Sequence, residues 1–471
     1  MRWILYNVLF AIAYAAMMPK FLLRMKKRGG YRAHFAERFG RYDPGTARRL
    51  AEKPRVWVHA VSVGEANLAG QVLAELRRRD PAASFVLSTT SSTGRAVCEK
   101  LVGPDDVCVY LPLDFPPCVR RALRAANVRA MVLVEAELWP NLLRALHRRG
   151  VPLLLANGRI SDRSAPGYRR LRFFFGPVLR LFDALLVQSE LDRDRLLAAG
   201  APADRTRVTG SIKFDVAPPA PEKTARARET LACAGIVPSA PASGSPAGGA
   251  GERSEPEGVV QHSAFSIQHS PIVLLGGSTW PGEELALARA WRDALPACPD
   301  ARLVLVPRHF ERAAAVAAEL ESAGFRVLRR SQAAADHQTT RPPDRETVLL
   351  VDTTGELFAL YALADLVFVG KTLAPNEGGQ NMIEPASLGR TTLVGPHTEN
   401  FKPAMEVFRR EGAVLEVPDA DALSREVSRL LSDPSARTAL GARAAAAVAG
   451  SRGALARTCD AIESVLSAPR P

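Results

Sequence analysis

Short apolar runs alternate with amphipathic stretches along most of the chain. The first series of strand-like runs covers residues 55–61, 84–90, 107–113, 130–137, 151–158, 184–189 and 207–213. A helical period follows Glu65, where the apolar side chains are Ala66, Leu68, Ala69, Val72, Leu73 and Leu76. Continuous apolar strands separated by helices indicate a parallel sheet that is covered by helices on both faces.

A second series of strand-like runs follows a break in this pattern. Residues 216–270 are rich in Pro, Gly, Ser and Ala, which is typical of a linker or a low-complexity insert. The apolar runs then resume at residues 271–279, 301–309, 347–352, 365–372 and 391–396. We therefore predict an α/β protein with two Rossmann-like parallel-sheet domains facing across a cleft, over residues 29–215 and 271–435. The Ala-rich residues 436–471 are predicted to be helical and able to pack back on the first domain.

Residues 1–28 carry a different pattern. An apolar run from Trp3 to Met18 precedes a cluster of positive charge between Lys20 and Arg28. A cleaved signal peptide carries its charge mainly before the apolar run, and the positive-inside rule places the following domain on the cytoplasmic side. The run is short for a span, which needs about 20 apolar residues. We expect a short membrane anchor or an interfacial helix, with a buried amino-terminal helix as the alternative.

The charge balance favours an anionic partner. The 471 residues include 62 Lys and Arg against 49 Asp and Glu, a formal net charge of +13. The basic residues are spread out and form no nucleic-acid-binding signature, so we expect an anionic membrane surface or a phosphorylated substrate and no nucleic acid. The six cysteines form no CxxC pair and no suitably spaced His pair is present, so we expect no zinc site.

Candidate chemistry begins at the end of the first strand-like run. Ser62-Val63-Gly64-Glu65 matches a capping box, in which Ser62 caps the helix and Glu65 reaches back to the Ser62 N–H. The alternative is that Gly64 allows close approach of a substrate while Glu65 acts as a general base. The two roles compete, because a carboxylate engaged in capping is less available to take a proton.

Further carboxylates follow a later strand. Glu135 and Glu137 are two residues apart where the run at 130–137 ends, so in extended conformation they face the same way. Two carboxylates at the carboxyl end of a sheet are costly unless they are paired or solvated in a cleft. The alternative is one carboxylate in a salt bridge and the other exposed.

Basic and aromatic residues are interleaved after the run at 151–158. Arg159 and Ser161 follow that strand directly, and the segment 169–175 reads RRLRFFF. Such a segment on a helix surface is suited to anionic lipid. The alternative is a packed phenylalanine core with a solvated arginine face.

In the second half, strand-to-helix junctions offer backbone N–H groups to an anion. These junctions are GGSTWPGEE (276–284), DTTGEL (352–357) and the Gly378-Gly379 turn, with Arg308 and Lys371 nearby. We predict a phosphate-binding face there. Glu384 could accept hydrogen bonds from a ribose diol, and its alternative is a charge on a helix surface.

Taken in order, these segments resemble one family. HAVSVGEA, EAELWPN, NGRISDRS, GSIKFD, GSTWPGEE, PRHFER, DTTGEL, FVGKTL, GGQNMIEPA and GPHTENF are similar to signature segments of the 3-deoxy-D-manno-octulosonic acid (Kdo) transferases, glycosyltransferase family 30. The resemblance covers roughly residues 30 to 430. It implies a GT-B fold and inverting transfer of Kdo from CMP-Kdo to a phosphorylated lipid A precursor in lipopolysaccharide biosynthesis. It also implies catalysis at the cytoplasmic face of the cell inner membrane, with no cofactor and no bound metal.

The resemblance implies roles for individual residues. The glutamate of the SVGE segment is the family's proposed general base and falls on Glu65, which the helix dipole would keep ionised. Glu135 and Glu137 are further catalytic candidates. Acceptor or membrane contacts are predicted at Ser62, Gly64, Arg159, Ser161, Arg169, Arg170 and Arg172. Donor-binding residues are predicted at Lys213, Ser278, Thr279, Arg308, His309, Gly355, Glu356, Lys371, Gly378, Gly379, Asn381 and Glu384.

The chain departs from the family pattern at two positions. Trp280 and Gln380 stand where the family usually has histidine, and neither can carry a proton or a positive charge. This puts acid assistance to the leaving group in doubt. The alternatives are therefore another GT-B nucleotide-sugar transferase or epimerase, or an inactive membrane-bound scaffold.

Overall fold

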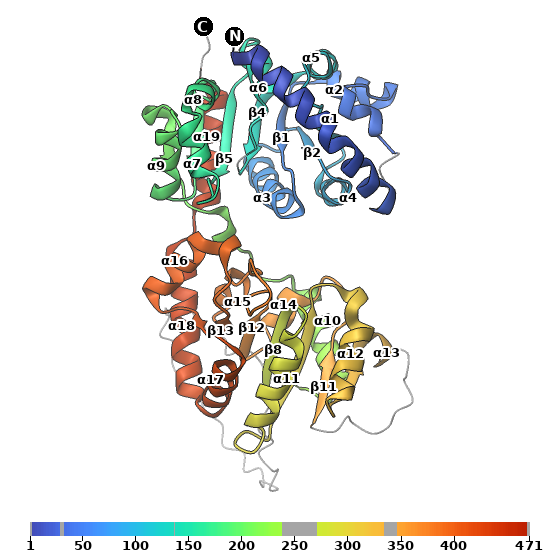
Figure 1. Ribbon diagram of the computed structural model, residues 1–471, viewed down its shortest axis with the longest axis vertical. Helices are drawn as coiled ribbons and strands as arrows, with labels where there is room; N and C mark the ends of the chain where they lie inside the picture. The colour runs from blue at the N-terminus through green and yellow to red at the C-terminus, as the bar shows by residue number, and fades with distance from the viewer. Residues whose placement is uncertain (1, 29–32, 136, 238–270, 334–345, 469–471) are drawn as a thin grey trace, which may run out of the picture. The chain divides into compact units, whose positions relative to one another are not determined.

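The computed structural model describes residues 2–28, 33–135, 137–237, 271–333 and 346–468. They form two compact units, the first built from residues 1–215 with 451–471 and the second from residues 216–450. Each unit contains one parallel sheet of seven strands, with helices on both faces (Figure 1). The prediction of two parallel-sheet α/β units is confirmed.

The sheet of the first unit has the strand order β3-β2-β1-β4-β5-β6-β7. Its strands are β1 (Arg55–His59), β2 (Phe85–Thr89), β3 (Val107–Tyr110), β4 (Val128–Val134), β5 (Leu153–Gly158), β6 (Ala184–Val187) and β7 (Thr206–Val208). Every residue of β1 is buried. Trp57 packs into the core on one face of the sheet and Val56 and Val58 into the core on the other, as the alternation of a strand requires.

Helices cover both faces of this sheet. They are α1 (Arg2–Arg28), α2 (Pro44–Glu52), α3 (Val63–Arg79), α4 (Ser92–Leu101), α5 (Pro116–Ala125), α6 (Pro140–His147), α7 (Ala165–Arg170), α8 (Arg172–Leu179), α9 (Glu190–Ala198) and α19 (Ala454–Ser467). Short 3-10 helices lie at Phe35–Phe39, Ala203–Arg205 and Ile212–Phe214. The last helix, α19, returns from the end of the chain to α3, where Asp460 and Glu463 pair with Arg79.

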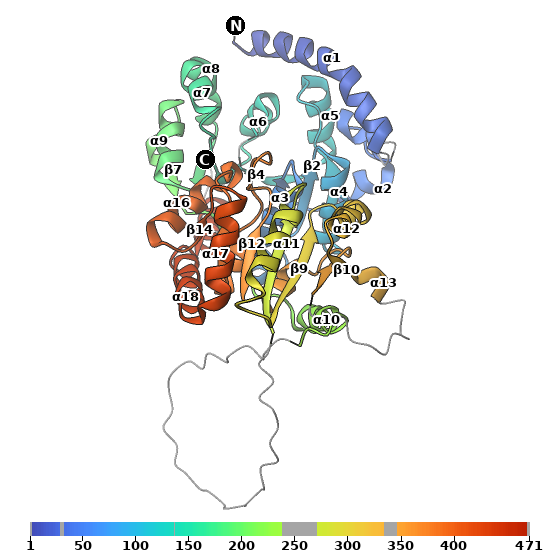
Figure 2. The ribbon, with the colours of Figure 1, turned by 60° about the horizontal axis from the view of Figure 1, so that its bottom comes forward.

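Helix α1 has one face against the protein and one face in solvent. Phe10 contacts Phe115 with ring centroids 5.0 Å apart, and α1 runs beside α5 (Figure 2). The Tyr6 hydroxyl donates to Asp114 at 2.7 Å. The outer face exposes apolar side chains, among them Ile4, Leu5, Val8, Leu9 and Ile12. Among the described residues, no helix is both long enough and apolar enough to cross a bilayer.

The second unit repeats the same plan with the strand order β10-β11-β9-β8-β12-β13-β14. Its strands are β8 (Ile272–Thr279), β9 (Ala301–Pro307), β10 (Arg326–Arg329), β11 (Thr347–Leu350), β12 (Leu366–Val369), β13 (Thr391–Val394) and β14 (Leu415–Glu416). Its helices are α10 (Pro221–Ala232), α11 (Glu283–Ala294), α12 (Ala313–Ser322), α13 (Arg330–Ala333), α14 (Leu357–Tyr361), α15 (Ile383–Ser387), α16 (Lys402–Glu411), α17 (Ala420–Ser432) and α18 (Pro434–Gly450), with 3-10 helices at Phe310–Arg312 and Glu399–Phe401.

Two predicted boundaries differ from the structure. Residues 221–232, assigned to the linker, form α10, whose Thr230 hydroxyl donates to the buried Glu356 at 2.6 Å. Of the predicted C-terminal helices, α18 belongs to the second unit and α19 to the first. The remainder of the predicted insert, residues 238–270, lies outside the described residues.

Candidate active site

In each unit the strand order reverses between two central strands, and the predicted site residues follow those strands. The reversal lies between β1 and β4 in the first unit and between β8 and β12 in the second. Glu65 follows β1 and Glu135 follows β4, whereas Trp280 follows β8 and Lys371 follows β12. In open parallel sheets, ligands bind beyond the carboxyl ends of the strands at such a reversal.

Glu65 lies in the first turn of α3 and forms a capping box with Ser62. The Glu65 N–H donates to the Ser62 hydroxyl at 3.2 Å, and that hydroxyl lies 2.9 Å from Glu65 Oε1. Glu65 Oε2 accepts the N–H of Val61 at 2.9 Å. The predicted capping box is therefore confirmed. The carboxylate of Glu65 accepts the N–H of Val61, whereas the sequence predicted that it would accept the N–H of Ser62.

Glu65 is half-buried among other charged groups of the same unit. Partial burial is the largest influence on its pKa and raises it, and the nearby Glu135 adds to the increase. The hydrogen bonds from Val61 and Ser62 and the charge of Lys213 act in the opposite direction. Desolvation therefore outweighs the groups that favour the anion, and the pKa of Glu65 is raised. That the helix dipole keeps this carboxylate ionised remains a prediction.

Two more carboxylates and one lysine complete this cluster. Lys213 Nζ lies 2.9 Å from Glu135 Oε1. The Glu137 residue is exposed to solvent. The surrounding protein still desolvates its carboxyl group, and this desolvation and the negative charge of Glu65 raise the pKa of Glu137 to about 7. The arrangement matches the alternative of one paired and one exposed carboxylate. It also brings Glu65, Glu135, Glu137 and Lys213 to one edge of the sheet.

Strained backbone supports this cluster. Glu135 has a φ of 67° and Asn157, near the end of β5, has a φ of 54°, both in the left-handed region. The Asn157 side-chain oxygen accepts the N–H of Ile212 at 3.0 Å and so fixes the short helix that carries Lys213. Residues held in such conformations concentrate at functional sites. Asn157 was missed in the sequence, where it reads as the last part of an apolar strand.

A second residue missed in the sequence is His59 at the end of β1. Its Nδ1 lies 2.9 Å from the Ser88 hydroxyl, and burial lowers the pKa of its imidazole to about 4. Its Nε2 and the indole N–H of Trp139 are buried, and neither has a hydrogen-bond partner among the described residues. In the sequence, His59 stands within an apolar strand and begins the HAVSVGEA segment, but no role was predicted for it.

The predicted acceptor contacts are spread over several loops. A Cβ on Gly64 would find its nearest neighbour at 3.9 Å, so the backbone there does not require glycine. Arg159 is half-buried and lines a small cavity with Glu135 and Tyr168. Ser161 is exposed, and its hydroxyl lies 3.0 Å from that of Ser164.

The basic and aromatic segment divides between core and surface. Phe174 contacts Tyr6 of α1 with ring centroids 5.6 Å apart, and Phe175 stacks on Tyr168 at 4.2 Å. Phe173 remains 62% exposed, next to the exposed Leu171. Exposed arginines surround them at positions 169, 170 and 172. The alternative of a packed phenylalanine core with a solvated arginine face is therefore confirmed for Phe174, Phe175 and the arginines, and contact with anionic lipid stays a prediction.

The second unit gathers a cation and two aromatic rings at the carboxyl ends of its central strands. Lys371 Nζ lies 4.9 Å from the centroid of the Trp280 ring, and the His309 ring meets that indole edge-on at 5.5 Å. Ser278 and Lys371 have φ values of 53° and 63°. Thr279 is buried, and its carbonyl accepts the N–H of the exposed Arg308 at 3.1 Å.

The glycine-rich turns of the second unit show the expected backbone. Gly378, Gly379 and Gly355 have φ values of 110°, 72° and 88°, where other residues would be strained. Glu384 is half-buried, accepts the Asn381 amide at 3.0 Å, and has its pKa raised by burial. Glu384 is therefore not the simple surface charge of the alternative reading.

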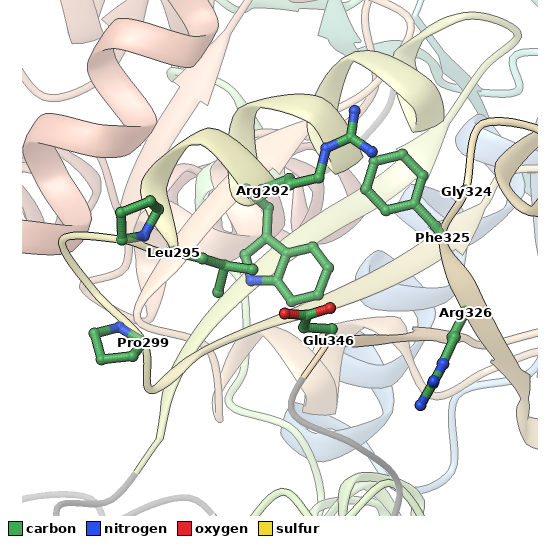
Figure 3. A pocket seen from close by; sticks show the side chains of 9 residues that line it. Arg292, Leu295, Pro299, Gly324, Phe325, Arg326 and Glu346 are labelled. Atoms are coloured by element: carbon green, nitrogen blue, oxygen red, sulfur yellow. The ribbon is translucent and has the colours of Figure 1, made fainter.

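One predicted donor-binding residue, Glu356, has a structural role, and a large cavity of the second unit lies away from the predicted site residues. Buried Glu356 accepts the hydroxyls of Thr230 and Thr353, so it joins α10 to the sheet. A cavity of about 770 Å³ lies at the opposite, amino end of the second sheet, where the Arg292 guanidinium lies over Phe325 (Figure 3). None of the predicted site residues lines this cavity.

Among the described residues, no group of three or more His, Cys, Asp or Glu side chains could hold a metal ion.

Comparison with known proteins gives the class and then the family. A glycosyltransferase structure from Rickettsia africae is 11% identical and covers 88% of this chain and 100% of its own, with a TM-score of 0.53. Two sheets with this topology, together with this structural likeness, show a fold of the GT-B type.

The more similar relatives identify the family. The family model described as 3-deoxy-D-manno-octulosonic-acid transferase (kdotransferase) matches residues 33–216. The 3-deoxy-D-manno-octulosonic acid transferase of Bordetella pertussis is 35% identical over 93% of this chain and 94% of its own. The 3-deoxy-D-manno-octulosonic acid transferase of Haemophilus influenzae is 30% identical over 93% of this chain and 92% of its own. The chain belongs to the 3-deoxy-D-manno-octulosonic acid transferase family.

Proposed function

We propose that the protein transfers Kdo from CMP-Kdo to a sugar hydroxyl of a phosphorylated lipid A precursor, with inversion at the anomeric carbon. The observation that carries this proposal is similarity over 93% of the chain to proteins named for Kdo transfer. The cluster of Glu65, Glu135, Glu137 and Lys213 supplies the residue types that acceptor activation needs.

Glu65 is proposed as the general base. A sugar hydroxyl is a weak nucleophile, and a carboxylate within hydrogen-bond reach can remove its proton as the new bond forms. Each Glu65 oxygen accepts one hydrogen bond in the cap, which leaves lone pairs on both because a carboxylate has about four acceptor positions. The partial burial that raises its pKa also makes it a stronger base.

The other charged residues of the cluster adjust this base. Lys213 pairs with Glu135 and offsets negative charge close to Glu65. Glu137, with its pKa of about 7, is close to half protonated at neutral pH. In that state it can accept or donate a hydrogen bond to the acceptor sugar, whereas a fully ionised carboxylate can only accept.

Donor binding is proposed for the second unit. CMP-Kdo carries a phosphate and a carboxylate, and Lys371 and Arg308 can pair with them while the Gly378-Gly379 turn offers backbone N–H groups. As the acceptor oxygen bonds to the anomeric carbon, the bond from that carbon to the phosphate oxygen breaks and CMP gains negative charge. The same cations would stabilise it. That no metal or cofactor takes part remains a prediction.

Membrane contact is proposed for the first unit, and the cytoplasmic face of the inner membrane is the proposed location. Helix α1 packs on α8 through the contact of Tyr6 with Phe174, and its outer face exposes apolar side chains. The neighbouring α7 and α8 expose Phe173 and three arginines. Apolar side chains with flanking arginines suit the interface of a bilayer with anionic headgroups.

The proposal is tested by the mass of the lipid product. Purified protein is incubated with CMP-Kdo and a phosphorylated lipid A precursor, and the lipid is examined by mass spectrometry. We expect the lipid to gain the mass of one or more Kdo residues as free CMP appears. A lipid of unchanged mass with CMP-Kdo, but increased with a UDP-sugar, would assign the protein to another transfer reaction. Release of CMP without any lipid product would also contradict the proposal.

A further inference from the structure

The carboxylate of Glu283 joins two separate segments of the second unit. Glu283 is the first residue of α11 and is only 1% exposed. Its Oε2 accepts the N–H groups of Trp280 at 2.9 Å and Lys371 at 2.8 Å. Its Oε1 accepts those of Thr372 at 2.9 Å and Leu373 at 3.0 Å. One side chain therefore satisfies four backbone donors.

These four hydrogen bonds hold a strained and closely packed junction. Lys371 is among the residues with a positive φ, and so is Ser278 just before the turn. Between the two segments, a Cβ on Gly370 would lie 2.4 Å from the Ser278 carbonyl oxygen and 2.8 Å from Glu283 Oε2. A non-glycine residue keeps such a conformation only where surrounding contacts impose it. At Lys371 the Glu283 carboxylate accepts the N–H, while the Lys371 carbonyl accepts the N–H of Gly379 at 2.9 Å.

The contact between these two segments determines where the Lys371 ammonium lies. With the backbone of Trp280 and Lys371 held by one carboxylate, the Lys371 ammonium rests over the indole face. An ammonium on an aromatic face keeps its charge while it loses part of its hydration. The indole N–H of Trp280 is buried and has no hydrogen-bond partner among the described residues.

We propose that Glu283 is a positioning residue for the donor nucleotide. By fixing the backbone of Trp280 and Lys371, it holds the Lys371 ammonium in place for an anionic phosphate. This inference rests on the proposed function, because it takes the anion to be that of a cytidine nucleotide. It also gives Trp280, one of the departures from the family pattern, a role as the surface that supports Lys371.

The adjacent Glu284 provides a matched control. It is also fully buried at the start of α11, but it pairs with Arg312 at 3.1 Å. Glu284→Gln should therefore disturb the same helix without releasing Lys371. Comparing Glu283→Gln with Glu284→Gln separates loss of positioning from general loss of stability.

The test measures CMP binding by isothermal titration calorimetry and the KM for CMP-Kdo. We expect Glu283→Gln to weaken CMP binding about tenfold and to raise the donor KM more than it lowers kcat, because a charge-assisted contact is misplaced. Glu284→Gln should bind CMP as the parent protein does. In a Lys371→Met background, Glu283→Gln should add little, since both changes remove the same contact.

Equal CMP binding by Glu283→Gln and the parent protein would overturn the inference, and so would fully additive effects of Glu283→Gln and Lys371→Met. If Glu283→Gln does not fold, Glu283→Asp takes its place with the same expectations, because the shorter side chain cannot reach both segments. Turnover of CMP-Kdo by the parent protein is measured first. The proposed function is thereby decided independently of Glu283.

Discussion

Glu65 caps helix α3 and is also the proposed general base. Its carboxylate accepts the Val61 N–H and the Ser62 hydroxyl, and it also lies among Glu135, Glu137 and Lys213. Capping fixes the rotamer, and a base must be held in place if it is to act on a bound hydroxyl. The two roles are compatible as long as one lone pair of the carboxylate faces the acceptor.

Glu137 makes the stability of the first unit depend on pH. Its pKa is about 7 in the folded protein and about 4.3 in an unfolded chain, so folding favours its protonated form. The resulting stabilisation is fully present below about pH 4.3 and is lost as the pH rises through about 7. We expect Glu137→Gln to be more stable than the parent protein at pH 8 and to lose that advantage by pH 4.5, as measured by urea unfolding.

Glu75→Gln provides the control for this pH dependence. Arg78 and Arg79 lower the pKa of Glu75 to about 2, so its stabilisation is present above about pH 4.3 and is lost only as the pH falls through about 2. Glu75→Gln should therefore reduce stability by a similar amount throughout the range from pH 4.5 to 8. If the free energies of unfolding of Glu137→Gln and the parent protein differ by the same amount at both ends of that range, the pKa assigned to Glu137 is wrong.

At the scale of the element, helix α1 combines two apolar faces. Trp3, Tyr6, Phe10 and Tyr14 recur every three or four residues and lie on the side that contacts the protein. The outer face is apolar as well. The sequence showed a helix-length apolar run but not which face packs, because packing depends on Asp114 and Phe115, about one hundred residues away.

The outer face of α1 predicts binding to lipid. We expect Leu5→Ser and Ile12→Ser, both at exposed positions, each to weaken partition onto anionic phospholipid vesicles by about tenfold, because each removes apolar area that can enter the bilayer. The melting temperature should change little. Leu191→Ser, at an exposed apolar position on α9, is the control that should leave partition unchanged. Equal vesicle binding by all three variants would exclude α1 as the contact.

Helix α10 shows where composition misleads. The Pro, Gly, Ser and Ala content of residues 216–270 indicated a linker, but residues 221–232 begin with a proline suited to the first helical turn and form a helix. The helix is held by the hydrogen bond of Thr230 to Glu356 across 126 positions of sequence. No local pattern reports such a contact.

At the scale of the whole molecule, the alternation of apolar strands and helices was sufficient to predict two parallel sheets. It also placed Glu65 and Glu135 each at the end of a strand, and the structure brings the two carboxylates close together because the carboxyl ends of parallel strands share one edge. The pairing of Lys213 with Glu135 could not be predicted, since it depends on the hydrogen bond of Asn157 to Ile212. The positive φ values of Glu135 and Lys371 were also hidden, because neither residue is a glycine.

The most direct measurement of the central claim is the turnover of Glu65→Gln beside that of Ser62→Ala. Glutamine can keep the capping box but cannot take a proton, so we expect turnover to fall by about 10²–10⁴ while the melting temperature changes little. Ser62→Ala should lose about 0.5–2 kcal/mol of stability, with a smaller effect on turnover. Turnover of Glu65→Gln equal to that of the parent protein, together with a lowered melting temperature, would show that Glu65 is only a cap.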